Sequence, residues 1–321
     1  MAGAVSRRTV LAAVVAAGAV AALPGCAAPF VDIRLRLATG SARGVYYRLG
    51  TALARAWQAE LGLTTAPVVL NTAGSLENVA LLEAGAADVV FSQVDAAVEQ
   101  LVGTTPDAVD APRALARIYD DVLHVVVPAT SSITSLPGLR GMRVSAGAAD
   151  SGVSVVARRL LDAAGLGAAD VRGVPLGLDD SVAAMAAGEI DAFFWSGGLP
   201  TPAVTELAQQ LPIRLLDLTE EGVLDTVRER YPIYAPGTVP ALSYAGIASP
   251  VTTMLVRNFL LVDAAMSDDL AEALVRVLFT EQEQLAQAGP TALTIDPRAA
   301  IGTEPVLLHP GAERFYRTER G

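Results

Sequence analysis

Apolar residues and arginines alternate over 33–37, and this period of two predicts a β-strand with one polar edge. A loop of small residues follows over 39–44. Beyond it, apolar residues recur at spacings of three and four, which predicts a helix over about 46–60. The apolar face of that helix consists of Tyr46, Leu49, Leu53 and Trp57. The first predicted unit is therefore a strand, a small-residue loop and a helix.

The same unit returns later in the chain. Residues 142–147 have the character of a strand, and 148–152 form a second loop of small residues. The segment 153–164 predicts a helix, which Gly165 would end as a left-handed cap.

A second internal similarity is clearer than the first. VALLEAGAADVVFSQ at 79–93 aligns with VAAMAAGEIDAFFWS at 182–196, at an offset of 103 residues. The matched positions include Gly85 with Gly188 and Asp88 with Asp191. In each copy a short helix stops at glycine, and an apolar strand then ends in polar residues. Chance likeness of alanine-rich helices is the competing explanation, but two similarities in the same order favour an internal repeat.

Alternating strands and helices predict an α/β fold with a parallel sheet in each of two lobes. Such sheets bind ligands beyond the carboxyl ends of their strands, so we expect the ligand in the cleft between the lobes. Two long apolar segments, 122–128 and 252–263, are the predicted crossovers of the hinge, and a helix over 268–288 returns the chain to the first lobe. The predicted lobes are 31–124 with 253–321, and 125–252.

The N-terminal segment is predicted to be a signal peptide over 1–26. Arg7 and Arg8 precede an apolar run over 9–23 that is short for a membrane span, and the run ends in the lipobox-like Leu-Pro-Gly-Cys. Cys26 is the predicted lipidation site, which would anchor the protein outside the cytoplasm. The arginine pair leaves Tat and Sec export both open, and an uncleaved anchor helix is the alternative.

Composition removes several classes of function. The 321 residues carry a formal net charge of −11, which repels phosphate backbones, so nucleic acid is not expected as a partner. All 23 basic residues are arginine, which excludes a Schiff-base or phosphate-loop lysine. One cysteine and two histidines do not supply a zinc site, and no G-x-S-x-G turn is present. We expect no metal and no cofactor.

Five sequence blocks in this chain resemble the TAXI class of TRAP-transporter solute receptors. The blocks are LATGSARGVYYRLGTALA (37–54), NTAGSLENVALLEAGAADVVFSQVDAA (71–97), VSAGAADSGVSVVARRLLDAAGL (144–166), DAFFWSGGLPTPAVTELA (191–208) and LLHPGAERFY (307–316). The resemblance implies a type II periplasmic-binding-protein fold, in which two hinged lobes close on a ligand. It also implies a small carboxylate or amino-acid-like ligand such as glutamate, and a partner made of TRAP membrane subunits. We expect a monomer.

The chain departs from that family at two loop positions. Val153 stands where a threonine is usual, and Arg43 stands where a small or polar residue is usual. The resemblance therefore fixes the ligand less closely than it fixes the fold.

The predicted ligand-binding residues cluster in the small-residue loops and at strand ends. Loops 39–44 and 72–75 each precede a helix, whose free N–H groups favour a carboxylate. Asp95 is a candidate for an ammonium group, whereas Ser75 has an alternative role as a helix cap and Trp195 has one in the core. The full set is Thr39, Gly40, Ser41, Arg43, Tyr46, Thr72, Gly74, Ser75, Asn78, Gln93, Asp95, Ser151, Trp195 and Tyr244.

Two other functions compete with transport. A ligand sensor that docks on a membrane sensor kinase would need the same fold. An enzyme would need a nucleophile, a base and an orienting group, and neither His124 nor His309 falls near the serines of the loops. We expect no enzyme activity, with His124 in a core or hinge and His309 in a structural turn.

Overall fold

The computed structural model describes residues 29–100 and 111–319. The predicted signal peptide and Cys26 lie outside the described residues. Among the residues it describes, no helix is long and apolar enough to cross a membrane.

The first half of the molecule is a parallel three-stranded unit in which β1 lies between β2 and β3. Its small-residue loops lead into helices, as the sequence predicts, but the first strand starts three residues later than expected. Its elements are β1 (Arg36–Ala38), α2 (Val45–Leu61), β2 (Val68–Leu70), α3 (Ser75–Glu83) and β3 (Val89–Gln93).

The second half repeats this order, with β5 lying between β6 and β7 and all pairings parallel. Its elements are β5 (Arg143–Ser145), α5 (Gly152–Ala163), β6 (Arg172–Gly173), α6 (Leu178–Ala186) and β7 (Ala192–Gly197). The glycines that end the matched helices both have left-handed backbone, with φ of 63° at Gly85 and 72° at Gly188. Gly165 also has a positive φ, of 69°. The predicted internal repeat is confirmed.

Matching ion pairs hold the equivalent strands in the two halves. Asp88 accepts hydrogen bonds from the backbone N–H and guanidinium of Arg36, at 2.7–3.0 Å. Asp191 accepts the same set from Arg143, at 2.6–3.1 Å. The conserved geometry explains why both aspartates stand directly before an apolar strand, where each ties the turn to the neighbouring strand.

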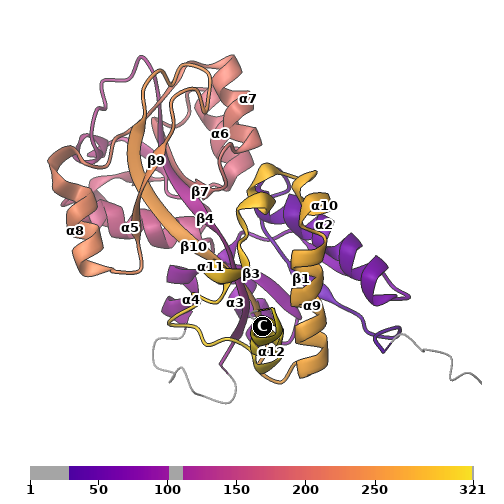
Figure 1. Cartoon of the computed structure of the whole chain (residues 1–321). Coiled ribbons are helices and arrows are strands. Elements are labelled where there is room, and N and C mark those ends of the chain that lie inside the picture. Colours follow the sequence, from indigo (N-terminus) through magenta and orange to yellow (C-terminus); the bar gives the residue numbers. More distant parts are fainter. Residues whose placement is uncertain (1–28, 101–110, 320–321) are drawn as a thin grey trace, which may run out of the picture.

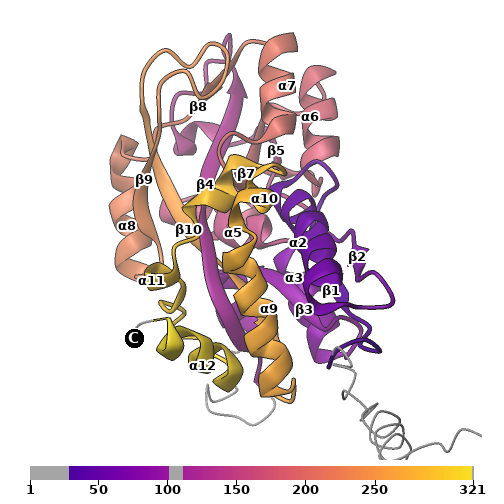
Figure 2. The same cartoon turned by 45° about the vertical axis from the view of Figure 1, so that its right-hand side comes forward.

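Two long antiparallel strands, β4 (Arg113–Pro128) and β10 (Val251–Val262), join the halves. They contain the predicted crossovers, although β4 is much longer than the expected 122–128. They also connect the predicted parallel strands of the two halves into one mixed sheet, with the order β2-β1-β3-β10-β4-β7-β5-β6. Two short strands, β8 (Ile213–Leu215) and β9 (Ala235–Val239), pair with β4 and β10 at the far end. Figures 1 and 2 show β4 and β10 running side by side between the halves.

The remaining helices cover the sheet. The predicted helix over 268–288 breaks at Glu281, where the backbone leaves the helical region, into α9 and α10. The other α-helices are α4 (Val94–Gln100), α7 (Pro202–Gln210), α8 (Val223–Arg230), α9 (Asp268–Thr280), α10 (Gln282–Ala286), α11 (Pro297–Ala300) and α12 (Pro310–Thr318). Short 3₁₀ turns occupy Leu136–Leu139, Ala168–Asp170, Glu220–Gly222 and Pro290–Thr294.

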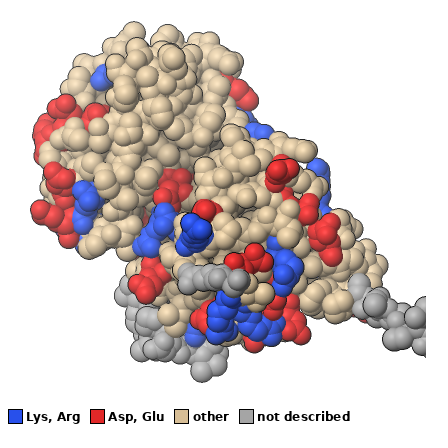
Figure 3. Space-filling view, viewed as in Figure 1, with Lys and Arg blue, Asp and Glu red and all other residues tan. Residues whose placement is uncertain are grey.

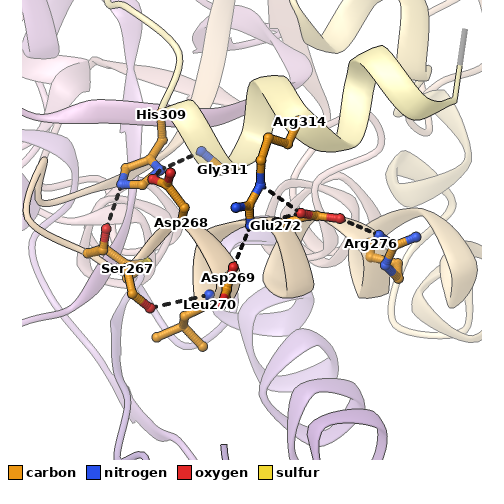
Figure 4. A network of polar contacts seen from close by, with 10 residues as sticks. Ser267, Asp268, Asp269, Leu270, Glu272, Arg276, His309, Gly311 and Arg314 are labelled. Carbon is orange, nitrogen blue, oxygen red and sulfur yellow. Dashed lines mark hydrogen bonds and ion pairs between the residues drawn. The ribbon is translucent and has the colours of Figure 1, made fainter. Parts of the chain in front are cut away.

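The predicted structural role of His309 is confirmed at the start of α12 (Figure 4). Its side chain is fully buried; Nδ1 accepts from the N–H of Gly311 at 3.1 Å, so Nε2 donates to the carbonyl of Met266 at 2.9 Å. A Cβ on Gly311 would lie 2.1 Å from the carbonyl oxygen of Asp268. Histidine, proline and glycine therefore fix the C-terminal helix tightly against α9.

Charged side chains of both signs are mixed on the surface. On the face in Figure 3, arginines lie among acidic residues and gather into no single basic field. Most ion pairs are partly exposed, for example Arg314 with Asp269 at 2.7 Å, so each stabilises the fold only slightly.

Candidate ligand site

A narrow cavity lies between the two halves, with about 420 Å³ of empty space including its open mouth. Its floor is the carboxyl ends of β3 and β7 and the middle of β4, which is where ligands of such sheets bind. The lining residues are Gly40, Ser41, Gly44, Val45, Tyr46, Ala73, Gly74, Ser75, Gln93, Tyr119, Asp121, Ser151, Gly152, Val153, Trp195, Ser196 and Gly197.

Three helices begin at this cavity. Gly44, Gly74 and Ser151 are the N-caps of α2, α3 and α5, and all three line it. The first turn of a helix has N–H groups without helical partners and carries a positive potential. The first turns of α2 and α5 hold no acidic side chain that would neutralise this potential. The helix N-termini that line the cavity therefore favour negative charge.

The floor of the cavity instead holds an acidic side chain, which favours positive charge. Asp121 is 2% exposed, and its Oδ2 accepts from Gln93 Nε2 at 2.7 Å and from Ser196 Oγ at 3.4 Å. Burial raises the pKa of this carboxyl from 3.8 to about 7, against the lowering effect of the hydrogen bonds from Gln93 and Ser196. The described residues that line the cavity include no arginine or histidine, so no lining cation neutralises Asp121.

Three cavity residues have a buried oxygen without a hydrogen-bond partner. The atoms are Gln93 Oε1, Tyr119 Oη and Asp121 Oδ1. Native proteins pair almost all buried polar atoms, because an unmade hydrogen bond costs about 1–3 kcal/mol. Such a group of oxygens in one cavity is typical of a site that a ligand completes.

Aromatic residues enclose the floor. The ring of Tyr46 stacks on that of Phe91, with centroids 4.9 Å apart, and lies edge-on to that of Tyr119 at 6.4 Å. The hydroxyl of Tyr46 donates to Asn258 Oδ1, beside a bulge in β10. Burial raises the pKa of Tyr46 and Tyr119 well above its usual value, so both are neutral phenols that offer hydrogen bonds.

The comparison with protein families covers most of the chain. Residues 37–321 match the model of the NMT1-like family. The chain belongs to this family.

Three solved structures share this fold at low sequence identity. PhnD1 from Prochlorococcus marinus MIT 9301, in complex with methylphosphonate, is 12% identical with a TM-score of 0.55, over 80% of this chain and 89% of that one. A Xanthomonas citri protein bound to ATP is 16% identical, with a TM-score of 0.50, over 89% and 98%. A ligand-binding component of an ABC-type import system from Staphylococcus aureus is 8% identical, with a TM-score of 0.50, over 84% and 88%. The fold of this NMT1-like protein is the predicted type II periplasmic-binding-protein fold.

The structure brings eight of the predicted site residues to the cavity. They are Gly40, Ser41, Tyr46, Gly74, Ser75, Gln93, Ser151 and Trp195. Ser75 is not the cap of α3, since Gly74 takes that position and Ser75 Oγ accepts from the backbone N–H of Gln93 at 3.1 Å. Ser151 caps α5 through Ser154 and also lines the cavity.

Three other predicted residues lie behind the loops of the first half. Asn78 Nδ2 donates to the carbonyls of Thr39 and Phe91, at 2.6 and 2.9 Å, and Asn78 Oδ1 accepts from Thr72 Oγ1 at 2.7 Å. Thr39 Oγ1 donates to the carbonyl of Leu70 at 2.6 Å. None of these three lines the cavity; they hold the two loops together.

Asp95 and Tyr244 also lie away from the cavity. Asp95 is fully buried, accepts from the hydroxyl of Tyr234 at 2.7 Å, and has its pKa raised by burial. Tyr244 accepts from the backbone N–H of Thr201 at 3.0 Å and contacts His124 Nε2 at 2.9 Å. Burial lowers the pKa of His124 to about 4, so His124 is the neutral core histidine that the sequence predicts.

Arg43 contacts the second half rather than the cavity. Its guanidinium pairs with Asp179 at 3.4 Å and with Glu206, on α6 and α7. It therefore bridges the mouth of the cavity from outside.

Sequence reasoning missed Tyr119 and Asp121, the two residues that project from the middle of β4. The local signal was the pair Asp120-Asp121 inside a long apolar strand. Asp120 faces the other way and pairs with Arg117 at 2.7 Å, so only one of the two acids lacks a cation. The other lining residues that were missed are Gly44, Val45, Ala73, Gly152, Val153, Ser196 and Gly197. No group of three or more possible metal ligands occurs among the residues that the structure describes.

Proposed function

We propose that this protein is an extracytoplasmic solute-binding receptor that closes two lobes on a small polar solute. The observation that carries the proposal is the cavity between the halves, in which Gln93, Tyr119 and Asp121 each present a buried oxygen without a partner. The family and the fold support a solute-binding protein.

The lobes of the proposal are residues 31–124 with 253–321, and residues 125–252. The halves meet in a closed arrangement: the backbone N–H of Glu77 donates to the carbonyl of Asp150 at 3.0 Å, and Gln93 Nε2 donates to Ser196 Oγ at 2.7 Å. Two strands, β4 and β10, pass from one half to the other, so bending there would separate the two walls of the cavity.

The solute of the proposal is a small carboxylate or an amino-acid-like molecule such as glutamate. Proteins of this fold hold different ligands, since PhnD1 is in complex with methylphosphonate and the Xanthomonas citri protein with ATP. The lining residues of this chain, rather than the fold, must therefore select the solute.

The partner of the proposal is a membrane transporter, with the protein anchored beside it through lipid on Cys26. The sequence blocks favour TRAP membrane subunits of the TAXI type, whereas the Staphylococcus aureus neighbour is a component of an ABC-type import system. Genes next to this one separate the two partners, and a neighbouring sensor-kinase gene would favour the alternative role in signalling. The receptor is preferred to an enzyme because the family and the fold support a solute-binding protein.

A screen of small solutes by thermal shift, followed by small-angle scattering, tests the receptor. A solute that raises the melting temperature should also reduce the radius of gyration, because contacts from both lobes favour the closed population. Binding without any compaction would contradict the hinge, and turnover of a bound solute would contradict the receptor in favour of an enzyme.

A further inference from the structure

The unpartnered oxygens of the cavity determine which hydrogen-bonding groups its ligand needs. Gln93, Tyr119 and Asp121 are each at most 3% exposed, so solvent does not reach these side chains freely. All three line one cavity: Gln93 ends β3, Tyr119 and Asp121 lie on β4, and β10 pairs with both of these strands. A ligand bound in this cavity can reach them.

The hydrogen-bond roles at this floor are fixed by Asp121. A carboxylate only accepts, so the group that Gln93 turns toward Asp121 Oδ2 is its NH₂, at 2.7 Å. The same NH₂ also donates to Ser196 Oγ at 2.7 Å, which uses both of its hydrogens. Gln93 Oε1 and Asp121 Oδ1 remain as acceptors, and Tyr119 Oη can accept as well. The ligand group that faces them must therefore be a donor.

The charge of Asp121 further limits which donor group the ligand can place there. The buried carboxylate of Asp121 has no cation among the described lining residues. A buried charge is stable only when it is paired. An ammonium group supplies a positive charge and three N–H donors, which equals the number of unpartnered oxygens.

The helix N-termini that line the cavity favour an anion. They are those of α2, α3 and α5, which reach the cavity through Gly44, Gly74 and Ser151. We propose that the cavity takes a zwitterionic amino-acid-like solute, with its ammonium group on Asp121, Gln93 and Tyr119 and its carboxylate at the three helix N-termini. The inference rests on the proposed receptor function and assigns the ammonium to Asp121, where the sequence pointed to Asp95.

A purely anionic solute is the rival. Such a ligand would leave Gln93 Oε1 unpaired and would tolerate Asp121 only in its protonated form, as a donor. Asparagine at 121 is neutral and also a donor. The variant Asp121→Asn therefore separates the two ligands, because it weakens an ammonium ligand and leaves an anion bound as before or more tightly.

The test is calorimetric titration of the full folded protein with matched sets of probes. Each set holds an amino acid, its deaminated acid and its decarboxylated amine: glutamate, glutarate and 4-aminobutyrate; alanine, propionate and ethylamine; leucine, 4-methylpentanoate and 3-methylbutylamine. Methylphosphonate serves as an anion without nitrogen. In at least one set we expect the amino acid to bind about a hundredfold more tightly than either truncated analogue.

Two variants and one control complete the test. Asp121→Asn should weaken the amino acid about a hundredfold, and Tyr119→Phe, which removes one hydroxyl, should weaken it about tenfold. Asp120→Asn is the matched control on the adjacent position, where the side chain pairs with Arg117 instead, and it should leave affinity unchanged. A cooperative melting curve of each variant without probe establishes that the variant is folded.

Two outcomes would overturn the inference. A deaminated acid or methylphosphonate that binds as tightly as any amino acid, and keeps its affinity in Asp121→Asn, would make the site an anion site while leaving the receptor function intact. Failure of every amino acid to bind would also overturn it. The wider screen of solutes and the measurement of lobe closure would then decide the receptor function separately.

Discussion

Gln93 and Ser196 meet across the cavity, where Gln93 Nε2 donates to Ser196 Oγ over 2.7 Å. The two residues are 103 positions apart and hold equivalent places in the internal repeat, Gln93 at the end of β3 and Ser196 near the end of β7. Each half of the molecule therefore places the end of an equivalent strand, β3 or β7, at the same cavity. This explains how two copies of a simple unit build one cavity.

The first prediction concerns Gly152, at the start of α5. A Cβ there would lie 2.1 Å from Gln93 Oε1 and 2.9 Å from Ser75 Oγ, both on the first half. Gln93 cannot turn away without losing its bonds to Asp121 and Ser196. Gly152→Ala should hold the halves apart, weakening solute binding at least tenfold and giving a larger radius of gyration by small-angle scattering.

Alanine is acceptable to the first turn of a helix, so this variant should melt at or above the temperature of the unchanged protein. Gly173→Ala is the control, because the same methyl group meets no atom within 4 Å there. Normal affinity in Gly152→Ala would mean that the closed contact is unnecessary for binding.

The repeat, the helices and the small-residue loops could be predicted because their signals are local. Periodicity located α2 and α5, and paired glycines and aspartates aligned the halves. The charge of the floor could not be predicted, because Asp121 becomes a cavity residue only through the pairing of β4 with β10 and β7. The bridging role of Arg43 could not be predicted for the same reason, since its partners Asp179 and Glu206 are distant in sequence.

The second prediction concerns Arg43 as a bridge between the halves. Its side chain is 39% exposed, and each of its two ion pairs contributes about 0.2–1 kcal/mol, so Arg43→Ala should weaken binding no more than about thirtyfold. The loss should fade in about 1 M salt, where charges are screened within about 3 Å. Titrations at two salt concentrations measure this, with Arg55→Ala on α2, the helix that follows Arg43, as the control. A hundredfold loss that persists in high salt would instead identify Arg43 as a clamp on the ligand.

The third prediction concerns the anchor. If Cys26 is acylated, Cys26→Ser should move the protein from the membrane fraction to the soluble fraction of its native host, and should abolish labelling by a radioactive or clickable fatty acid. Retention of the variant in the membrane would indicate an uncleaved N-terminal helix instead.

The last prediction concerns the pH dependence of stability that Asp121 imposes. Burial raises the pKa of its carboxyl to about 7 in the folded protein, above the 3.8 of the unfolded chain. The folded state therefore keeps a proton that the unfolded chain has already released, and stability falls as the pH rises from about 4 to about 7. For one group the slope is at most about 1.4 kcal/mol per pH unit.

Asp121→Asn removes this titration while its side-chain oxygen can still accept from Gln93. We expect the variant to gain stability over the unchanged protein as pH rises through that window, and to be the more stable of the two at pH 8 without ligand. Urea unfolding at pH 5, 6, 7 and 8 measures the difference, in which the contribution of buried Asp95, whose pKa is also raised, cancels. Asp120→Asn controls for the neighbouring charge, and the neutral phenols of Tyr46 and Tyr119 do not titrate in this range. A pH-independent difference would mean that Asp121 is not the strained, unpaired acid of the cavity. A gain in stability joined to a loss of amino-acid binding would instead show that the protein keeps this acid, at a cost in stability, for its ligand.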